Sequence, residues 1–156
     1  AEDGIRDSVA SRGLGDVYKR QLQHRASDDA VARGKAVTVL TYLHGTKESE
    51  DAIETLKAEG YDVDLVELTC LKPFDKETVE TSLKRTHKLA MLDESTRSGG
   101  VGATMSALVA ETLFDELDAP VLRLCMEDAP VPYATEMEKE MVKRASDLVA
   151  GVKSMC

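Results

Sequence analysis

The sequence has no tryptophan and no asparagine, and aromatic residues make up only 4% of its 156 residues. With so few rings to bury, the core of the protein has to be built from aliphatic side chains. Hydrophobic residues still account for 42% of the chain, which is enough for an ordinary core. This length and composition are typical of one globular domain.

Positive charge is also scarce. The 20 Lys and Arg residues face 29 Asp and Glu residues, so the formal net charge is -9. Nucleic-acid binding needs clustered Lys and Arg to neutralise phosphates, and anionic membrane surfaces attract basic segments. We therefore expect neither nucleic acid nor a membrane as a partner. No apolar run approaches the roughly 18 residues that a membrane-spanning helix needs.

Cysteine is rare too, with three residues whose spacing forms neither a CxxC pair nor a zinc pattern. An odd count in a chain of this size favours reduced thiols in a reducing compartment. Cys70 and Cys125 stand at the ends of apolar runs, so we expect both to be buried as small hydrophobic residues. Cys156 ends the chain.

Residues 1–21 fit no targeting role. They lack the apolar run of about 7–15 residues found in secretory signals, and they mix acidic with basic residues, unlike a transit peptide. Residues 3–21 resemble a peptide translated from sequencing-library adapter; the alternative is a frayed polar arm. We expect 1–21 to be non-native or disordered, residues 22–156 to form the domain, and the native sequence to be cut off just before Leu22.

Beyond Gly34, strand-like and helix-like patterns alternate four times. The continuous β-rich apolar run at 37–42 predicts a strand buried on both faces, and apolar residues at helical spacing predict the intervening helices. The expected strands are 37–42, 63–68, 89–93 and 121–125, and the expected helices are 47–60, 75–86, 103–117 and a closing helix over 145–155. Residues 26–35 could add a short edge strand. The pattern predicts an α/β fold, a three-layer α/β/α domain with a mostly parallel sheet of four to five strands.

The helix expected over 103–117 is apolar around most of its circumference. Such a helix is normally buried on most sides, whereas an outer helix of a three-layer domain should have one wet face. We therefore predict that it packs on the sheet and also on a partner subunit or a missing domain. The predicted interface residues are Met105, Leu108, Val109 and Phe114.

A glycine-rich loop precedes this helix, in the place where helix N-termini bind phosphates. It does not match a dinucleotide fingerprint, because Met105 replaces the third glycine and residues 94–98 separate the loop from the strand. Glycines that allow a tight turn and close helix packing are the simpler interpretation. A candidate anion site remains at Arg97, Gly99, Gly100 and Gly102.

No convincing catalytic set emerges from the sequence. There is no G-x-S-x-G nucleophile elbow, and the histidines share no metal-ligand spacing. We expect all three histidines to be structural or solvent-facing: His24, His44 and His87. The carboxylate pairs Asp93-Glu94 and Glu127-Asp128 follow strands, where we expect solvated loop acids. We predict no catalytic, cofactor-binding or metal-binding residues.

Four segments resemble a known family: VTVLTY, VDLVELTCLKPFDKETV, SLKRTHKLAMLDESTRSGGVGA and LDAPVLRLCMEDAPVPYA. In order and spacing they look like the C-terminal half of pyruvate dehydrogenase beta subunits and, more broadly, the transketolase C-terminal domain. The resemblance covers residues 30–156. KPFD, KRTHK and the final Cys156 resemble the plastid-type subunit of algae and plants. The chain departs from the family at Leu43-His44, where Ser-Arg or Gly-Arg is frequent, and at Thr96, where a bulky residue is frequent.

The resemblance implies a thiamine diphosphate cofactor that lies between subunits of the full complex. The alpha subunit supplies the diphosphate and magnesium site, whose motif ends in paired asparagines, and the preceding half of the beta subunit supplies the activating glutamate. Because this chain has no asparagine, we expect the fragment not to bind the cofactor. The C-terminal domain would contribute to assembly of a heterotetramer with the alpha subunit and a second beta subunit, and to docking of the dihydrolipoyl acyltransferase core.

The function implied is therefore assembly of an enzyme that oxidatively decarboxylates pyruvate to the acetyl group of acetyl-CoA. The plastid stroma is the expected compartment, with the mitochondrial matrix and the bacterial cytoplasm as alternatives. Alternative functions are the beta subunit of a branched-chain 2-oxoacid dehydrogenase, another transketolase-like enzyme, a stand-alone non-catalytic interaction module, and a nucleotide-binding domain that uses the glycine loop.

Overall fold

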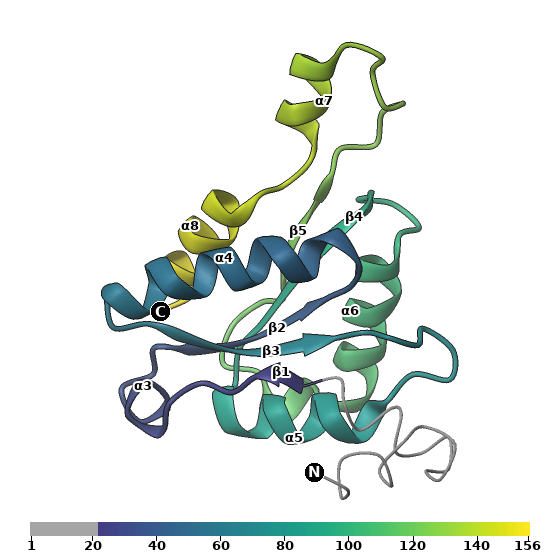
Figure 1. Ribbon diagram of the computed structural model, residues 1–156. Coiled ribbons are helices and arrows are strands. Elements are labelled where there is room, and N and C mark those ends of the chain that lie inside the picture. The colour runs from purple at the N-terminus through teal and green to yellow at the C-terminus, as the bar shows by residue number, and fades with distance from the viewer. Residues whose placement is uncertain (1–21) are drawn as a thin grey trace, which may run out of the picture.

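The computed structural model describes residues 22–156 as a five-stranded sheet with helices on both faces (Figure 1). The strand order is β1-β3-β2-β4-β5; β3, β2, β4 and β5 are parallel, and β1 pairs antiparallel with β3. The predicted three-layer fold with a mostly parallel sheet is confirmed. The leader predicted at 1–21 lies outside the described residues and stays a prediction.

Along the chain the elements are β1 (Leu22–His24), α3 (Asp28–Ala32), β2 (Ala36–Thr41), α4 (His44–Ala58), β3 (Asp62–Glu67), α5 (Lys76–Thr86), β4 (Leu89–Thr96), α6 (Val101–Thr112), a 3-10 turn (Phe114–Glu116), β5 (Leu122–Met126), α7 (Thr135–Met141) and α8 (Ala145–Met155). The chain passes from β2 to β3 on one side and then crosses to β4 on the other side of β2. The order of the strands therefore reverses between β2 and β4.

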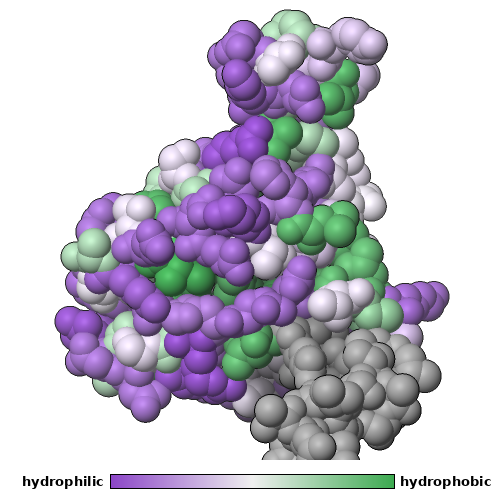
Figure 2. Space-filling view, viewed as in Figure 1, coloured by the Kyte–Doolittle hydropathy of each residue, from purple (hydrophilic) through white to green (hydrophobic). Residues whose placement is uncertain are grey.

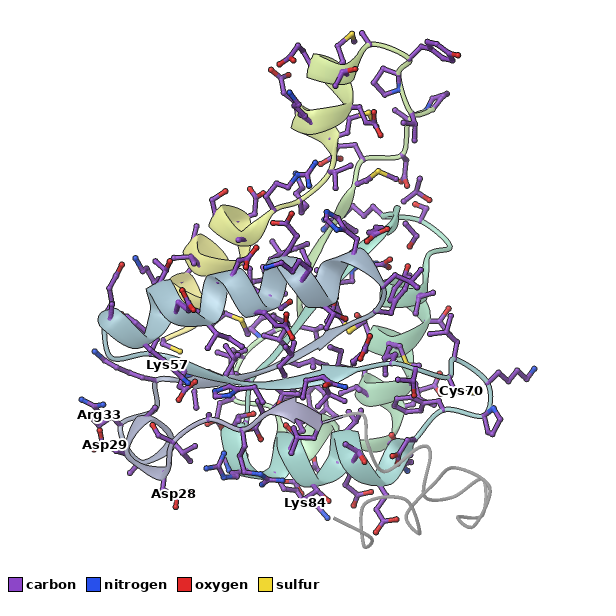
Figure 3. The ribbon with its side chains drawn as sticks, in the orientation of Figure 1. Asp28, Asp29, Arg33, Lys57, Cys70 and Lys84 are labelled. Carbon is purple, nitrogen blue, oxygen red and sulfur yellow. The ribbon has the colours of Figure 1, made fainter. Side chains whose placement is uncertain are left out.

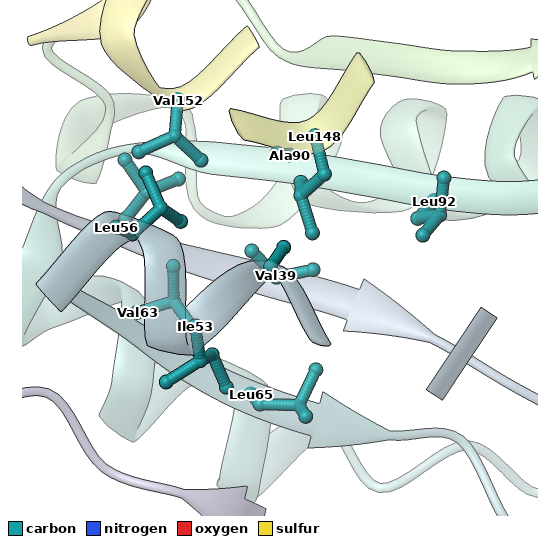
Figure 4. Close-up of a cluster of buried hydrophobic side chains, with 11 residues drawn as sticks. Val39, Ile53, Leu56, Val63, Leu65, Ala90, Leu92, Leu148 and Val152 are labelled. Carbon is teal, nitrogen blue, oxygen red and sulfur yellow. The ribbon is translucent and has the colours of Figure 1, made fainter. Parts of the chain in front are cut away.

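Two aliphatic clusters hold the layers together, one on each face of the sheet. Helices α4 and α8 cover the first face, where Val39, Leu56 and Leu148 are fully buried (Figure 4). Helices α5 and α6 cover the second face, where Leu40 and Leu83 are fully buried. Neighbouring residues of β2 thus serve opposite faces, as the period of two in a strand requires.

A buried carboxylate ties the first described segment to the sheet. Asp64 in β3 accepts hydrogen bonds from the amide of Ala26 at 2.7 Å, the hydroxyl of Ser82 at 2.9 Å and Nη1 of Arg85 at 2.9 Å. Nearby, Asp62 accepts from Nε2 of His24 at 2.8 Å. These contacts satisfy charges that would otherwise be costly to bury, and they fix residues 24–26 against β3 and α5.

Three elements differ from the sequence prediction. Residues 28–32 form helix α3 and no edge strand, because Ser27 caps the helix by accepting from the amide of Ala30 at 3.3 Å. The edge strand is β1 instead. The helix expected over 103–117 is shorter, since α6 gives way to the 3-10 turn. Helix α7 was not expected at all.

The last helix returns the chain to the amino ends of the strands. There Nζ of Lys88, just before β4, lies 3.4 Å from Sγ of the exposed Cys156. Cys125 is buried, as predicted, whereas Cys70 is only half-buried in the loop after β3 (Figure 3). A buried position was wrong for Cys70 because this loop lies at the surface.

Candidate functional site

Polar side chains gather at the carboxyl ends of β2 and β4, where the strand order reverses. Ligands of open α/β sheets bind at such a switch point, which makes this edge the first place to look for chemistry. Helix α4 begins after β2 and helix α6 begins after β4, so two helix N-termini point toward the same edge.

Asp93 is the centre of the first cluster. Its side chain is buried, with the residue only 3% exposed, and its carboxylate accepts from the Tyr42 hydroxyl, from the Ser95 amide at 2.8 Å and from the Gly102 amide at 2.6 Å. Burial acts to raise the pKa of Asp93, but the hydrogen bonds from Tyr42, Ser95 and Gly102 outweigh it and leave the pKa below its ordinary value. Burial and the neighbouring Asp93 carboxylate raise the pKa of Tyr42 to about 12.

Glu94 lies at the N-terminus of α4, as Asp93 lies at the N-terminus of α6. Its Oε1 accepts from the amide of Gly45 at 3.0 Å, in the first turn of α4. The chain's own carboxylates thus lie at the N-termini of both α4 and α6, where an anionic ligand would otherwise bind. These residues do not fit the diphosphate of thiamine diphosphate at this edge, because Asp93 and Glu94 would repel it.

Of the predicted anion-site residues, Arg97, Gly99 and Gly100 lie in the loop before α6, and Gly102 lies in the first turn of that helix. Asp128, which follows β5, accepts from the amide of Ser98 in that loop at 2.7 Å and from the Ser98 hydroxyl at 2.6 Å. The side chain of Arg97 is exposed, while Gly102 already donates its amide to Asp93. Gly99 has a φ of 72°, a conformation that favours glycine and supports the tight-turn interpretation. The anion site at Arg97, Gly99, Gly100 and Gly102 stays a prediction.

The expectation of solvated acids was wrong for Asp93, which is buried. The sequence offers no spacing that joins Asp93 to Tyr42, because the hydrogen bond depends on β2 and β4 lying side by side. Asp128, in contrast, is exposed at the surface as expected.

The predicted interface residues, three in α6 and Phe114 in the 3-10 turn after it, divide into two pairs. Met105 and Val109 are buried in the cluster between α6 and the sheet, so both face this chain's own core. Leu108 is half-buried and Phe114 is 69% exposed. Only Leu108 and Phe114 therefore lie where another chain could touch them. The interface itself stays a prediction.

Another cluster, which the sequence did not predict, joins α4 to the start of α8. Oε1 of Glu48 lies 3.0 Å from Nη1 of Arg144, and Oε2 accepts from the amide of Ala145 at 2.8 Å. Arg144 Nη1 also donates to Nε2 of His44 over 3.0 Å. Beside this cluster is a hollow of about 410 Å³. Its lining residues are His44, Glu94, Met126, Val131, Glu138, Val142 and Arg144.

The three histidines each lie against a partner within the chain: Asp62 for His24, Arg144 and Glu48 for His44, and the carbonyl of Glu116 for His87. Among residues 22–156, no group of three or more His, Cys, Asp or Glu side chains is placed to hold a metal ion. Within the same residues, no helix has the length and apolar character to cross a membrane.

Comparison with known proteins gives the family. The sequence model of "Transketolase, C-terminal domain" matches residues 29–148. The chain belongs to the transketolase C-terminal domain family. Among solved structures, a split gene transketolase described as an inactive beta4 tetramer superposes with a TM-score of 0.66 and 29% identity, over 78% of this chain and 39% of that one.

Curated members of this family similar to the chain are beta subunits of the pyruvate dehydrogenase E1 component. The chloroplastic beta-3 subunit of Oryza sativa is 36% identical over 128 residues, and the chloroplastic beta-2 subunit of Arabidopsis thaliana is 37% identical over 128 residues. The subunit of Staurastrum punctulatum is also 37% identical. The match covers 82% of this chain in each case, but only 33%, 32% and 39% of these relatives. The family prediction is confirmed, and the chain spans about a third of the relatives' length.

Proposed function

We propose that the chain is the C-terminal assembly domain of the beta subunit of a plastid pyruvate dehydrogenase. The complete enzyme oxidatively decarboxylates pyruvate to the acetyl group of acetyl-CoA, and thiamine diphosphate is its cofactor. The observation that carries this assignment is the identity of 36–37% over 128 residues with chloroplastic E1 beta subunits. In the proposed role the domain contributes surfaces for the alpha subunit, a second beta subunit and the dihydrolipoyl acyltransferase core, and no bond-making residue.

The site geometry supports a role in assembly. Asp93 and Glu94 are held by backbone amides at the strand ends, so this edge forms a rigid support. Thiamine diphosphate, in this proposal, is bound by the other parts of the complex. Titration of the cofactor into the 156-residue chain should then give no binding heat, and micromolar binding would contradict the proposal.

A domain replacement tests the proposal directly. Residues 22–156 would replace the matching part of the chloroplastic beta-2 subunit of Arabidopsis thaliana, and the chimera would be co-expressed with its alpha subunit. We expect a heterotetramer that oxidises pyruvate in preference to branched-chain 2-oxoacids. A folded chimera that fails to bind the alpha subunit would contradict the assignment, and a preference for branched-chain substrates would favour the related dehydrogenase.

A second candidate function is a non-catalytic module that assembles with copies of itself. It is favoured by the similarity to a transketolase subunit described as an inactive beta4 tetramer. Reading the transcript upstream of the Leu22 codon separates the two. A pyrimidine-binding domain encoded there favours the dehydrogenase, and a start codon directly upstream favours the module.

A further inference from the structure

The side chains of Lys88 and Cys156 meet at the amino ends of the parallel strands, at the opposite end of the sheet from the candidate site. Nζ of Lys88, the residue just before β4, lies 3.4 Å from Sγ of Cys156, which follows α8. The two residues are 68 positions apart in the sequence, so the fold brings them together. An amine and a thiol, both of which are nucleophiles when deprotonated, thus lie in direct contact.

Both elements that carry this pair are held by the rest of the domain. The carbonyl of Lys88 accepts from the amide of Thr38 at 2.9 Å, which fixes Lys88 beside β2. Helix α8 ends beside the end of α4, where Nζ of Lys153 donates to Oε1 of Glu59 at 2.6 Å (Figure 1). Val152 in the same helix is fully buried in the cluster on the first face of the sheet. The contact between amine and thiol therefore follows from packed elements.

The partners of the Lys88 amine are both uncharged. Its Nζ donates to the carbonyl of Gly34 at 2.6 Å and to the Cys156 thiol, and among residues 22–156 no carboxylate forms an ion pair with it. By contrast, hydrogen bonds to carboxylate partners raise the pKa of Lys47 and that of Lys84. A carboxylate partner favours the protonated form of an amine, and that form has no lone pair with which to attack a carbonyl group.

The thiol is the more accessible of the two groups. Cys156 is exposed, whereas Lys88 is half-buried and its amine is held at the carbonyl of Gly34. The surface at this end of the molecule, where α4 ends, is mostly hydrophilic in the view of Figure 2. A water-soluble electrophile that approaches from solution therefore reaches the sulfur first. Thiolates are strong nucleophiles, and they exchange readily with the thiol group of a thioester.

We propose that Cys156 and Lys88 form an acyl-transfer pair, which takes an acyl group from a small-molecule thioester and leaves it on Lys88 as an amide. In the first step the Cys156 thiolate attacks the carbonyl carbon of the thioester. A new S–C bond forms, the old one breaks, and the carrier leaves as a thiolate that takes up the proton lost by Cys156. In the second step the free amine of Lys88 attacks the same carbon, the bond to Cys156 breaks, and its sulfur receives the amine proton.

The second step is favoured because it is intramolecular. Sγ lies 3.4 Å from Nζ, so an acyl carbon bonded to the sulfur is within reach of the amine, and such proximity replaces a collision in solution. One amide replaces one thioester, the thiol is regenerated, and no oxidant or reductant is needed. The amide removes the positive charge of Lys88 but keeps one N–H for the carbonyl of Gly34. Acetyl-CoA, the product of the enzyme proposed above, is a thioester of this class, although the transfer rests on the two side chains and not on that assignment.

The test incubates the 156-residue chain with acetyl-CoA and follows each lysine by mass spectrometry. Lys88 should gain an acetyl group, and Cys156→Ser should slow this at least about tenfold, because the intramolecular route loses its first acceptor. Lys76, exposed at the start of α5, serves as the reference and should acetylate at the same rate in both proteins. The matched control Cys70→Ser removes a thiol from the loop after β3 and should leave the rate at Lys88 unchanged.

Lys88→Arg separates the two steps. In this variant the acetyl group should remain on Cys156 as a thioester, which neutral hydroxylamine removes, whereas it leaves amides intact. Equal acetylation of Lys88 in the original chain and in Cys156→Ser would mean direct attack by the amine and would overturn the proposal. An acetyl group that stays on Cys156 in the original chain would overturn it as well. Neither result bears on the dehydrogenase assignment, which the domain replacement tests separately.

Discussion

The backbone amide of Gly102 donates a hydrogen bond to Oδ2 of Asp93 over 2.6 Å, joining the first turn of α6 to β4. The other carboxylate oxygen accepts from the hydroxyl of Tyr42, which follows β2. One buried side chain therefore connects two neighbouring strands and a helix, at a helix N-terminus, the kind of place where anions commonly bind.

Replacing Asp93 with asparagine should lower the free energy of unfolding by about 2 kcal/mol, because hydrogen bonds to a buried charged group are among the stronger ones. Urea unfolding of the variant measures this. Asp128→Asn is the matched control, since Asp128 also accepts from a backbone amide but is exposed. A loss for Asp128→Asn as large as that for Asp93→Asn would show that burial is not the cause.

The Tyr42 hydroxyl should ionise later than an ordinary phenol, because burial and Asp93 raise its pKa to about 12. Its folded-state pKa is raised, so its contribution to stability is present below about pH 10 and is lost as the pH rises through about 12. Absorbance titration of tyrosinate should show a late component that is absent from Tyr42→Phe. If that component remains in the variant, another tyrosine is responsible.

Acid should weaken the fold through three carboxyl groups. Burial acts to raise the pKa of Glu48, Asp62 and Asp93, but hydrogen bonds outweigh it and leave each pKa below its ordinary value. Their stabilisation is fully present above the unfolded pKa values of about 4 and is lost as the pH falls through the lower folded values. Urea unfolding at several pH values should show a shallower acid-side decline in Glu48→Gln. An unchanged decline would exclude Glu48 as a contributor.

Met105 in α6 and Phe114 in the 3-10 turn that follows should respond differently to mutation. Met105→Ala should lower the free energy of unfolding by about 2–5 kcal/mol, because the side chain is buried in the cluster beneath the helix. Phe114→Ala should change it by less than about 0.5 kcal/mol, because the ring is exposed. If Phe114 contributes to the proposed interface, the same variant should weaken binding to the alpha subunit in pull-down titrations. Normal binding would exclude it.

The parallel strands were predictable because each is a short stretch rich in apolar residues that stands between two helix-like patterns. The edge strand β1 was not predictable in the same way. Its residues Leu22–His24 pair with β3 through backbone hydrogen bonds, and their side chains show no apolar alternation. Helix α3 did carry a signal, since Ser27 followed by two acidic residues is a typical N-cap.

The site was less predictable than the fold. Tyr42 and Asp93 are far apart in sequence, and the same is true of Glu48 and Arg144. Only the sheet topology and the packing of α4 on α8 bring each pair together. Helix α7 carries neither a side-chain cap nor a buried residue, so no local pattern marks it.

The position of Cys156 has a practical consequence. Its thiol is exposed beside Lys88 at the amino ends of the strands, and the segment 129–142, which contains α7, leaves the sheet at the carboxyl ends (Figure 1). With Cys70 changed to serine and Cys125 buried, a maleimide would react with this one thiol among the described residues. The chain could then be tethered to a sensor surface in a single orientation, with the segment 129–142 facing the solution.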